Sequence, residues 1–168
     1  MDILEEHVIK ETEKWWEIAK KELNISAGNL MVEFSLTGKT AGIADTVNMK
    51  INYNFIIIEE NFHEFCLRTI PHEVAHIAAN LYFKDNCGHG KGWVWVMEKV
   101  FKVKDVTRCH NYDISAVFEK RGKEVFEYVC GCKTKHYISK TIHNKIQNGQ
   151  KRHCTKCKTG IYWIKGEI

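Results

Sequence analysis

The chain has 168 residues, of which 44% are hydrophobic and 27% charged, and its formal net charge is +4. This balance is typical of a globular protein and excludes a disordered or fibrous chain; the length suits one compact domain with a small appendage. No run approaches the roughly 18 apolar residues of a membrane span. The acidic start lacks the basic and then apolar layout of a signal peptide. We therefore expect a cytoplasmic monomer that makes no membrane contact.

The first 54 residues predict one helix and two strands. Apolar residues at helical spacing predict an amphipathic helix over 3–22, with Asp2 as its N-cap and Glu5 as the partner in a capping box. Alternation of apolar and polar residues predicts strands over 30–36 and 47–54. We expect these two strands to pair.

Residues 61–83 again show helical spacing, and they include Pro71, the only proline of the chain. Inside a helix, proline removes one backbone hydrogen bond and bends the axis, whereas in a first turn it is harmless. The sequence therefore permits either one helix kinked at Pro71 or a short helix followed by a second one. We favour the kinked helix. A further helix is predicted over 92–103, with Trp93 among the residues that pack inward.

The central helix contains His72-Glu73-x-x-His76. Residues four apart lie on one face of a helix, so both imidazoles can bind one Zn²⁺ at about 2.0–2.1 Å. Glu73 would lie beside the metal, where a carboxylate can take a proton from the attacking water. The alternative is a chance match on an ordinary amphipathic helix with histidines in its core. The apolar residues around the motif favour the metal site.

A catalytic zinc usually has three protein ligands, and His89 is the best third candidate. It lies in the short loop 86–90, which could return beneath the helix. Cys87 in the same loop is expected to pack there, with a second option as a neighbour of the metal. His110 could orient a ligand from outside the metal shell, or could be an ordinary surface or core histidine.

Four of the seven cysteines gather in the last third of the chain, as Cys130-x-Cys132 and Cys154-x-x-Cys157. Short strands predicted over 126–129, 136–139 and 160–164 flank them, which is the layout of a zinc ribbon. Because a segment this small can bury only a small hydrophobic core, a structural zinc would stabilise its fold. The alternative is four free cysteines. Of the three remaining cysteines, we expect Cys66 and Cys109 to be small buried hydrophobic residues.

The fourth ligand of this second zinc site is open, because the first cysteine pair is one residue shorter than the usual C-x₂-C. We choose Cys132. His136 is the substitute, and His143 comes third.

Positive charge is concentrated at the end of the chain. Residues 121–168 contain 11 Lys or Arg and 3 Asp or Glu, a net of +8, whereas residues 1–120 have a net of −4. Such a surface could bind DNA phosphates, or could only aid solubility. Aromatic rings could stack on unpaired bases or pack within the ribbon. The candidate DNA contacts are Lys133, Lys135, Lys140, Lys145, Lys151, Arg152, Lys156 and Lys158, with the aromatic residues Tyr137, Tyr162 and Trp163.

Taken together, these motifs resemble those of the SprT family of zinc metallopeptidases, which is related to the Spartan proteases. The resemblance is carried by the glycine-rich segment 38–44, the strand 51–54 that ends in Asn, the zinc helix 69–76, the His-Gly-x-x-Trp segment 89–93 and the cysteine pairs. It implies an α+β fold. A small zincin-like metallopeptidase domain over 1–120, with three main helices packed on a short sheet, would precede a zinc ribbon over 121–168.

The resemblance also implies a function. His72, His76 and His89 would bind one catalytic zinc, Glu73 would be the base, and the ribbon would hold one structural zinc and contact single-stranded or otherwise exposed DNA. Spartan-type relatives cleave proteins trapped on DNA, and in this class a strand edge beside the zinc helix often binds the substrate as an added strand. Two alternatives stay open: a DNA- or transcription-associated zinc protein without protease activity, and a zinc peptidase that acts on ordinary proteins.

Overall fold

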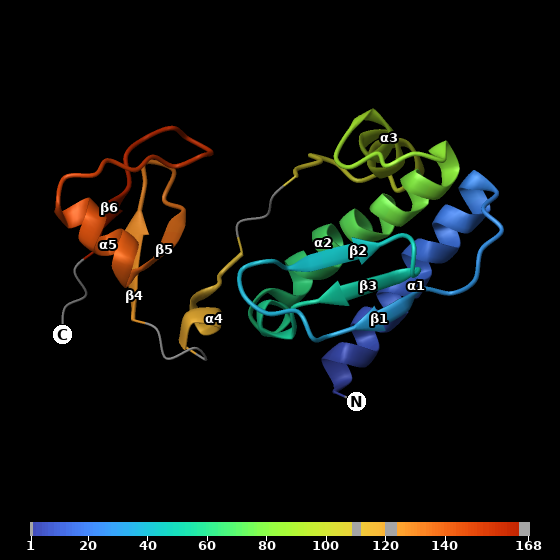
Figure 1. Ribbon diagram of the computed structural model, residues 1–168, viewed down its shortest axis with the longest axis horizontal. Helices are drawn as coiled ribbons and strands as arrows, with labels where there is room; N and C mark the ends of the chain where they lie inside the picture. The colour runs from blue at the N-terminus through green and yellow to red at the C-terminus, as the bar shows by residue number, and fades with distance from the viewer. Residues whose placement is uncertain (1, 109–111, 120–123, 165–168) are drawn as a thin grey trace. The chain divides into compact units, whose positions relative to one another are not determined.

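The computed structural model describes residues 2–108, 112–119 and 124–164, and the chain divides into two compact units, Met1–His110 and Asn111–Ile168 (Figure 1). Helices and small sheets occur in both units, so the prediction of an α+β fold is confirmed. The domain boundary predicted after residue 120 stays a prediction. Within the described residues, no helix has the length and apolar character needed to cross a membrane.

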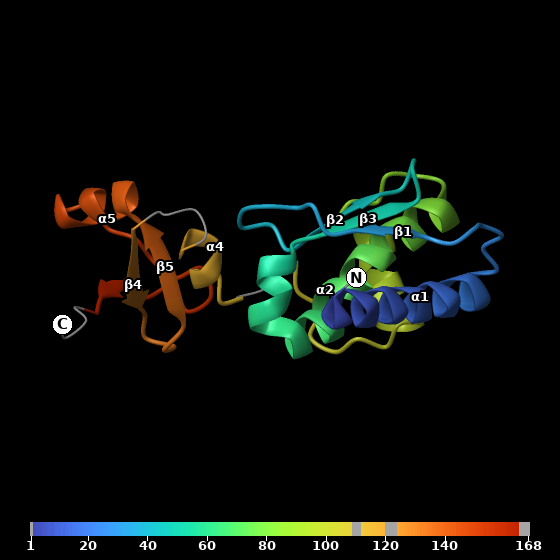
Figure 2. The same ribbon diagram turned by 90° about the horizontal axis from the view of Figure 1, so that it is seen from below.

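The first unit is a three-stranded sheet with helices on one face (Figure 2). The strand order is β1-β3-β2, with β1 parallel and β2 antiparallel to the central β3. Helices α1 and α2 pack against each other and cover the same face of the sheet. The elements are α1 (Ile3–Leu23), β1 (Met31–Glu33), β2 (Gly42–Asp45), β3 (Lys50–Tyr53), α2 (Phe55–Phe83), α3 (Lys91–Trp95) and the π-helix η1 (Val96–Val100).

Helix α1 and its cap match the prediction. The Asp2 carboxylate accepts a hydrogen bond from Leu4 N at 2.8 Å, and Asp2 N donates to the Glu5 carboxylate at 2.9 Å. These two bonds form a capping box, which satisfies amides that have no partner inside the helix. The helix buries Val8 and Trp16 against the rest of the unit.

The expected pairing of the first two predicted strands is confirmed, since β1 pairs with β3. Ile51 and Tyr53 of β3 are fully buried, and the Tyr53 hydroxyl lies 3.2 Å from that of Thr12 on α1. The sequence did not predict β2, because four residues that begin with glycine are too short to show an alternating pattern. This missed strand contacts α2 and proves central to the site below.

Helix α2 begins six residues earlier than the predicted Asn61. The backbone leaves helical geometry at Asn61 itself (φ −132°, ψ 27°), where the side-chain amide bonds to Ile57 O at 3.0 Å. Figure 2 shows the first turns of α2 at an angle to the rest. Pro71 lies within the regular part, so the kink predicted there was placed wrongly. The third predicted helix is divided into α3 and the π-helix η1.

The second unit contains a small antiparallel sheet, in the order β5-β4-β6. The three predicted strands are present, although the last is only two residues long, and α5 was not predicted. Phe126, Tyr128, His143 and Trp163 pack together beside the sheet. The elements are α4 (Ser115–Glu119), β4 (Val125–Val129), β5 (Lys135–Ser139), α5 (Lys140–Gln147) and β6 (Tyr162–Trp163).

Two candidate metal centres

The first unit brings three histidine side chains together. His72 and His76 lie one turn apart on α2, and the Nε2 atom of His89 approaches the Nε2 atoms of His72 and His76 at 2.9 Å and 3.2 Å. His72 is 6% exposed, and the other two rings are half-buried. Three ring nitrogens therefore meet in one partly enclosed space.

A tight turn places His89 in this cluster. Gly90 N donates to Cys87 O at 2.7 Å, and Gly88 adopts a positive φ of 47°. A Cβ atom at residue 90 would lie 2.8 Å from Cys87 O, so only glycine fits there without a shift of the backbone. The glycines on either side of His89 are thus needed to return the chain beneath the helix.

Asn80, one turn beyond His76, ties this loop to the sheet. Its side-chain oxygen accepts a hydrogen bond from Cys87 N at 2.9 Å, and its amide group donates to the Thr46 hydroxyl at 2.9 Å. One side chain therefore links the loop of the third histidine to the chain just after β2. Sequence reasoning missed Asn80; its four-residue spacing from His76 was the available signal.

Trp93 packs beneath the cluster. The indole nitrogen donates to His72 O at 3.1 Å, and the ring stacks on His76 with centroids 5.5 Å apart. Its ring is also edge-on to those of His72 and His89, at 4.7 and 4.8 Å. The fully buried Trp93 thus restricts the orientation of all three imidazoles. The sequence indicated that it packs inward and that it belongs to the His-Gly-x-x-Trp segment, but it did not indicate these contacts with the three rings.

Glu73 is buried at the side of β2. A Cβ atom on Gly42 would lie 2.7 Å from Glu73 Cγ, and the backbone of Ala44 donates a hydrogen bond to the carboxylate. Burial raises the pKa of Glu73 to about 8, against the opposing effect of this hydrogen bond. A cation held by the histidines would favour the ionised form.

The three histidines fit zinc. Tetrahedral zinc with Zn–N bonds of 2.0–2.1 Å has ligand nitrogens about 3.3 Å apart, close to the observed 2.9 and 3.2 Å. Burial and then the nearby His89 lower the pKa of His76 to about 4, so this ring is neutral near pH 7, as a ligand must be. The His76 ring also hydrogen-bonds to the backbone of Gly88, which leaves Nε2 directed at the cluster.

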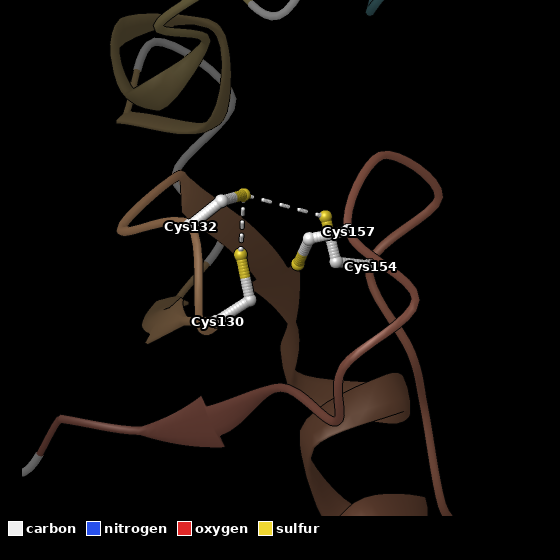
Figure 3. A group of neighbouring side chains, drawn as sticks. All are labelled: Cys130, Cys132, Cys154 and Cys157. Carbon is white, nitrogen blue, oxygen red and sulfur yellow. Dashed lines mark hydrogen bonds between the residues drawn. The ribbon is translucent and has the colours of Figure 1, made fainter.

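The second unit brings the four predicted cysteines together (Figure 3). Cys130 Sγ lies 3.2 Å from Cys132 Sγ, which lies 4.0 Å from Cys154 Sγ, and all four sulfurs, with that of Cys157, are within 4.8 Å of one another. Four thiolates around zinc at about 2.3 Å would be separated by about 3.8 Å. The cluster therefore has the donor set and the spacing of a zinc centre.

Two matching turns form this cluster. Lys133 N donates to Cys130 O at 2.8 Å, and Lys158 N donates to Cys154 O at 2.9 Å. Both lysines have a positive φ, 59° and 60°, which is uncommon for residues with a side chain. The Thr159 hydroxyl joins the turns, because it accepts a bond from Gly131 N at 2.9 Å.

Neighbouring hydroxyl groups lower the pKa of two of the thiols and so favour the thiolate form. The Thr159 hydroxyl, 3.0 Å from the sulfur, lowers the pKa of Cys157 to about 5. The Thr134 hydroxyl, at 3.2 Å, likewise lowers the pKa of Cys132. Because metal binding requires the thiolate, both hydrogen bonds favour the form that coordinates.

The alternative histidine ligands lie elsewhere. His143 is buried in the small core, stacked on Phe126 at 3.6 Å and hydrogen-bonded to the Tyr128 hydroxyl at 3.1 Å. His136 is also outside the sulfur cluster. Cys87 and Cys66 are half-buried thiols outside both groups. His110 and Cys109 fall outside the described residues.

The eight basic residues predicted to contact DNA are all exposed. Lys135 and Lys140 form ion pairs with Glu127 and Glu124, at 3.1 and 2.8 Å. Of the three aromatic candidates, Tyr162 is 59% exposed, whereas Trp163 packs against Phe126 and His143. The Tyr137 hydroxyl donates to Asp113 at 3.0 Å.

The fold and these sites define an α+β protein with two candidate metal centres, one of which has a buried carboxyl group beside it. Residues 9–112 match the model of the SprT-like family. The chain therefore belongs to the SprT-like family.

Three relatives illustrate the match. Protein SprT of Proteus mirabilis is 34% identical over 88% of this chain and 85% of its own length. Protein SprT of Pasteurella multocida is 34% identical over 77% and 76%, and that of Shewanella oneidensis is 28% identical over 94% and 98%. No solved structure gives a significant match.

Proposed function

We propose that this protein is a zinc-dependent endopeptidase that cleaves proteins bound or crosslinked to DNA. The observation that carries the proposal is the buried Glu73 next to His72, held against the edge of β2 beside three converging imidazoles. A site that only stabilises the fold has no need of a carboxyl group there, since burying one is costly. A zincin-like peptidase needs this group as its base.

His72, His76 and His89 would hold the zinc, which when bound lowers the pKa of water and polarises the substrate carbonyl. Glu73 accepts the proton of the attacking water and passes it to the leaving amine. The backbone N–H of Ala44 and the close contact with Gly42 hold the carboxylate in place. Trp93 and Asn80 restrain the histidines.

The substrate would lie along β2 as an added strand. In support, β2 is at the edge of its sheet and contacts α2, the helix that carries Glu73. Ile43, in the middle of this strand, is half exposed. Main-chain hydrogen bonds to such an edge bind a polypeptide with little regard to its sequence.

DNA would be bound by the C-terminal unit, as a zinc ribbon in which the four cysteines hold a structural zinc. Its eight exposed basic side chains and the exposed ring of Tyr162 support this assignment. Because phosphate contacts release counterions, affinity for single-stranded DNA should fall steeply as salt is raised. A flat salt titration would contradict the assignment.

The proposal is tested with the substitution Glu73→Gln. The variant should bind zinc as the wild type does and lose cleavage of a DNA-bound protein by several orders of magnitude. Glu64→Gln, an exposed carboxylate on the same helix that pairs with Arg68, is the matched control. Undiminished cleavage by Glu73→Gln would refute the role of the base. Assays with and without single-stranded DNA separate a DNA-directed peptidase from an ordinary one, and absence of all cleavage would favour a non-proteolytic zinc protein.

A further inference from the structure

A groove of about 430 Å³ lies beside the histidine cluster and does not form part of the chemistry above. Its volume is within the range of ligand-binding pockets. His89 belongs both to the cluster and to the wall of this groove, so an occupant would lie next to the reacting bond. The lining residues are His89, Gly90, Lys91, Val94, Trp95, Glu98 and Arg108.

The uncharged part of the wall comes from Gly90, Val94 and Trp95. The charged residues of the wall are Lys91, Glu98 and Arg108, and all three are exposed. Long charged side chains can border a groove with their aliphatic stems while their ends stay in water. An apolar occupant therefore suits the groove, with charges of both signs at its border.

The tryptophan wall is held in position by two further rings. Trp95 is 39% exposed, yet it lies parallel to Tyr82 with centroids 5.8 Å apart and edge-on to Phe83 at 5.9 Å. Phe83 is anchored in turn, because a Cβ atom on Gly92 would lie 2.9 Å from its ring. A wall that is fixed before binding loses little freedom when a ligand is bound.

We propose that this groove is a side-chain subsite of the proposed peptidase and selects a bulky apolar residue next to the scissile bond. The inference rests on the proposed function and adds a substrate preference to it. Trp95 and Val94, which line the groove, contact the substrate side chain and give it apolar surface to cover.

Charge argues against DNA as the occupant. Residues 1–120 carry a net charge of −4, whereas the +8 of the chain lies in residues 121–168. The groove is lined by the negative Glu98 as well as by the positive Lys91 and Arg108. It therefore lacks the purely positive potential that binds phosphates. Its contact with His89 places the occupant at the peptide bond instead.

The subsite is tested by digesting a peptide mixture with the full-length, zinc-loaded chain and mapping the cleavage sites by mass spectrometry. Wild-type cleavages should cluster beside large apolar residues. Val94→Trp, which fills the groove, should lower the ratio of kcat/KM for a bulky to a small side chain at that position by roughly 10-fold or more. Trp95→Ala, which widens it, should change the same ratio. Val47→Trp is the matched control, since Val47 is 91% exposed on the turn after β2, and it should leave the ratio unaltered.

Each outcome decides the matter. A wild type that cleaves but shows no apolar preference, or prefers acidic residues, overturns the subsite and leaves the peptidase proposal standing. The subsite is also overturned if Val94→Trp and Trp95→Ala both fold, bind as much zinc as the wild type, and leave the ratio of kcat/KM for bulky and small side chains unaltered. If Trp95→Ala weakens DNA binding without altering the preference, the groove belongs to DNA. A zinc-loaded wild type that cleaves nothing overturns the peptidase proposal and the subsite with it.

Discussion

At the scale of single residues, the position of the candidate base Glu73 depends on Gly42, which has no side chain. Gly42 leaves room for the end of the Glu73 side chain, whose Cγ and carboxyl atoms lie 2.7–3.0 Å from where a Cβ atom would be. The N–H of Ala44, two residues on, binds the carboxylate. The same short strand therefore positions Glu73 and would offer its edge to the proposed substrate.

Gly42→Ala should displace the carboxylate while leaving the histidines in place. A shift of about 1 Å in a catalytic group can lower a rate by roughly 100-fold, so we expect a loss of cleavage on that order with zinc content unaltered. Gly28→Ala is the control, because a Cβ atom there meets no atom within 4 Å. Wild-type kcat in Gly42→Ala would show that the contact does not position Glu73.

Trp93→Phe should show how much the hydrogen bond from the Trp93 indole to His72 O contributes to the free energy of unfolding. The substitution keeps an aromatic ring and leaves the buried His72 carbonyl without its donor, which should cost about 1–3 kcal/mol in the free energy of unfolding. Urea denaturation of the zinc-free chain measures it. Trp15→Phe is the matched control, because Trp15 Nε1 is buried and has no hydrogen-bond partner among the described residues. Equal losses in the two variants would assign the effect to ring volume alone.

At the scale of elements, the sequence predicted the helices and strands that have a long hydrophobic pattern or a recognisable capping residue. Helix α1 has a cap and many turns, and β3 alternates clearly, so both were found. His72 and His76 were predictable because a four-residue spacing on a helix dictates a shared face, whereas His89 was predicted from its place in the loop that follows. Strand β2 and helix α5 were missed, since one has four residues and the other eight mostly polar ones.

The kink in α2 shows why element ends are hard to predict. Proline weakens a helix through a missing donor, and the sequence therefore suggested a bend at Pro71. The backbone instead departs from helical geometry at Asn61, where a side-chain amide supplies a local alternative to the helical hydrogen bond. Such competition depends on the conformation already formed, which residue type alone does not reveal.

The fourth ligand of the C-terminal centre can be tested at this scale too. Loss of one thiolate should remove a whole zinc, so Cys132→Ser should lower the zinc content from two to about one per chain. His136→Ala and His143→Asn should keep both ions. Metal analysis of the purified full-length variants measures the number of zinc ions per chain. Retention of two ions by Cys132→Ser, with loss in either histidine variant, would reassign the ligand.

At the scale of the whole molecule, the two units are stabilised differently. The first has an extensive core in which Trp16, Tyr53, Phe65 and Trp93 are fully or almost fully buried. Among its described residues, the second has a small cluster of rings beside short strands, and we expect so small a core to need support to fold. Removal of the metal should therefore affect them unequally.

Treatment with a strong chelator should unfold the second unit and leave the first folded. We expect amide hydrogen exchange to become fast in β4, β5 and β6, while α1 and α2 keep most of their protection. Restoring zinc should return the protection. Persistent protection of the small sheet after complete metal loss would mean that its apolar contacts alone maintain the fold.

The two lysines with positive φ give the cysteine turns a further property. Glycine would adopt this backbone conformation with less strain, but it would bring no charge. Four thiolates and one zinc ion carry a net charge of about −2, which repels phosphate. Lys133 directly follows Cys132, and Lys158 directly follows Cys157, so one cation accompanies each turn. With zinc bound, these two cations would offset the charge of the centre locally, and the proposed DNA partner could approach the surface that surrounds it.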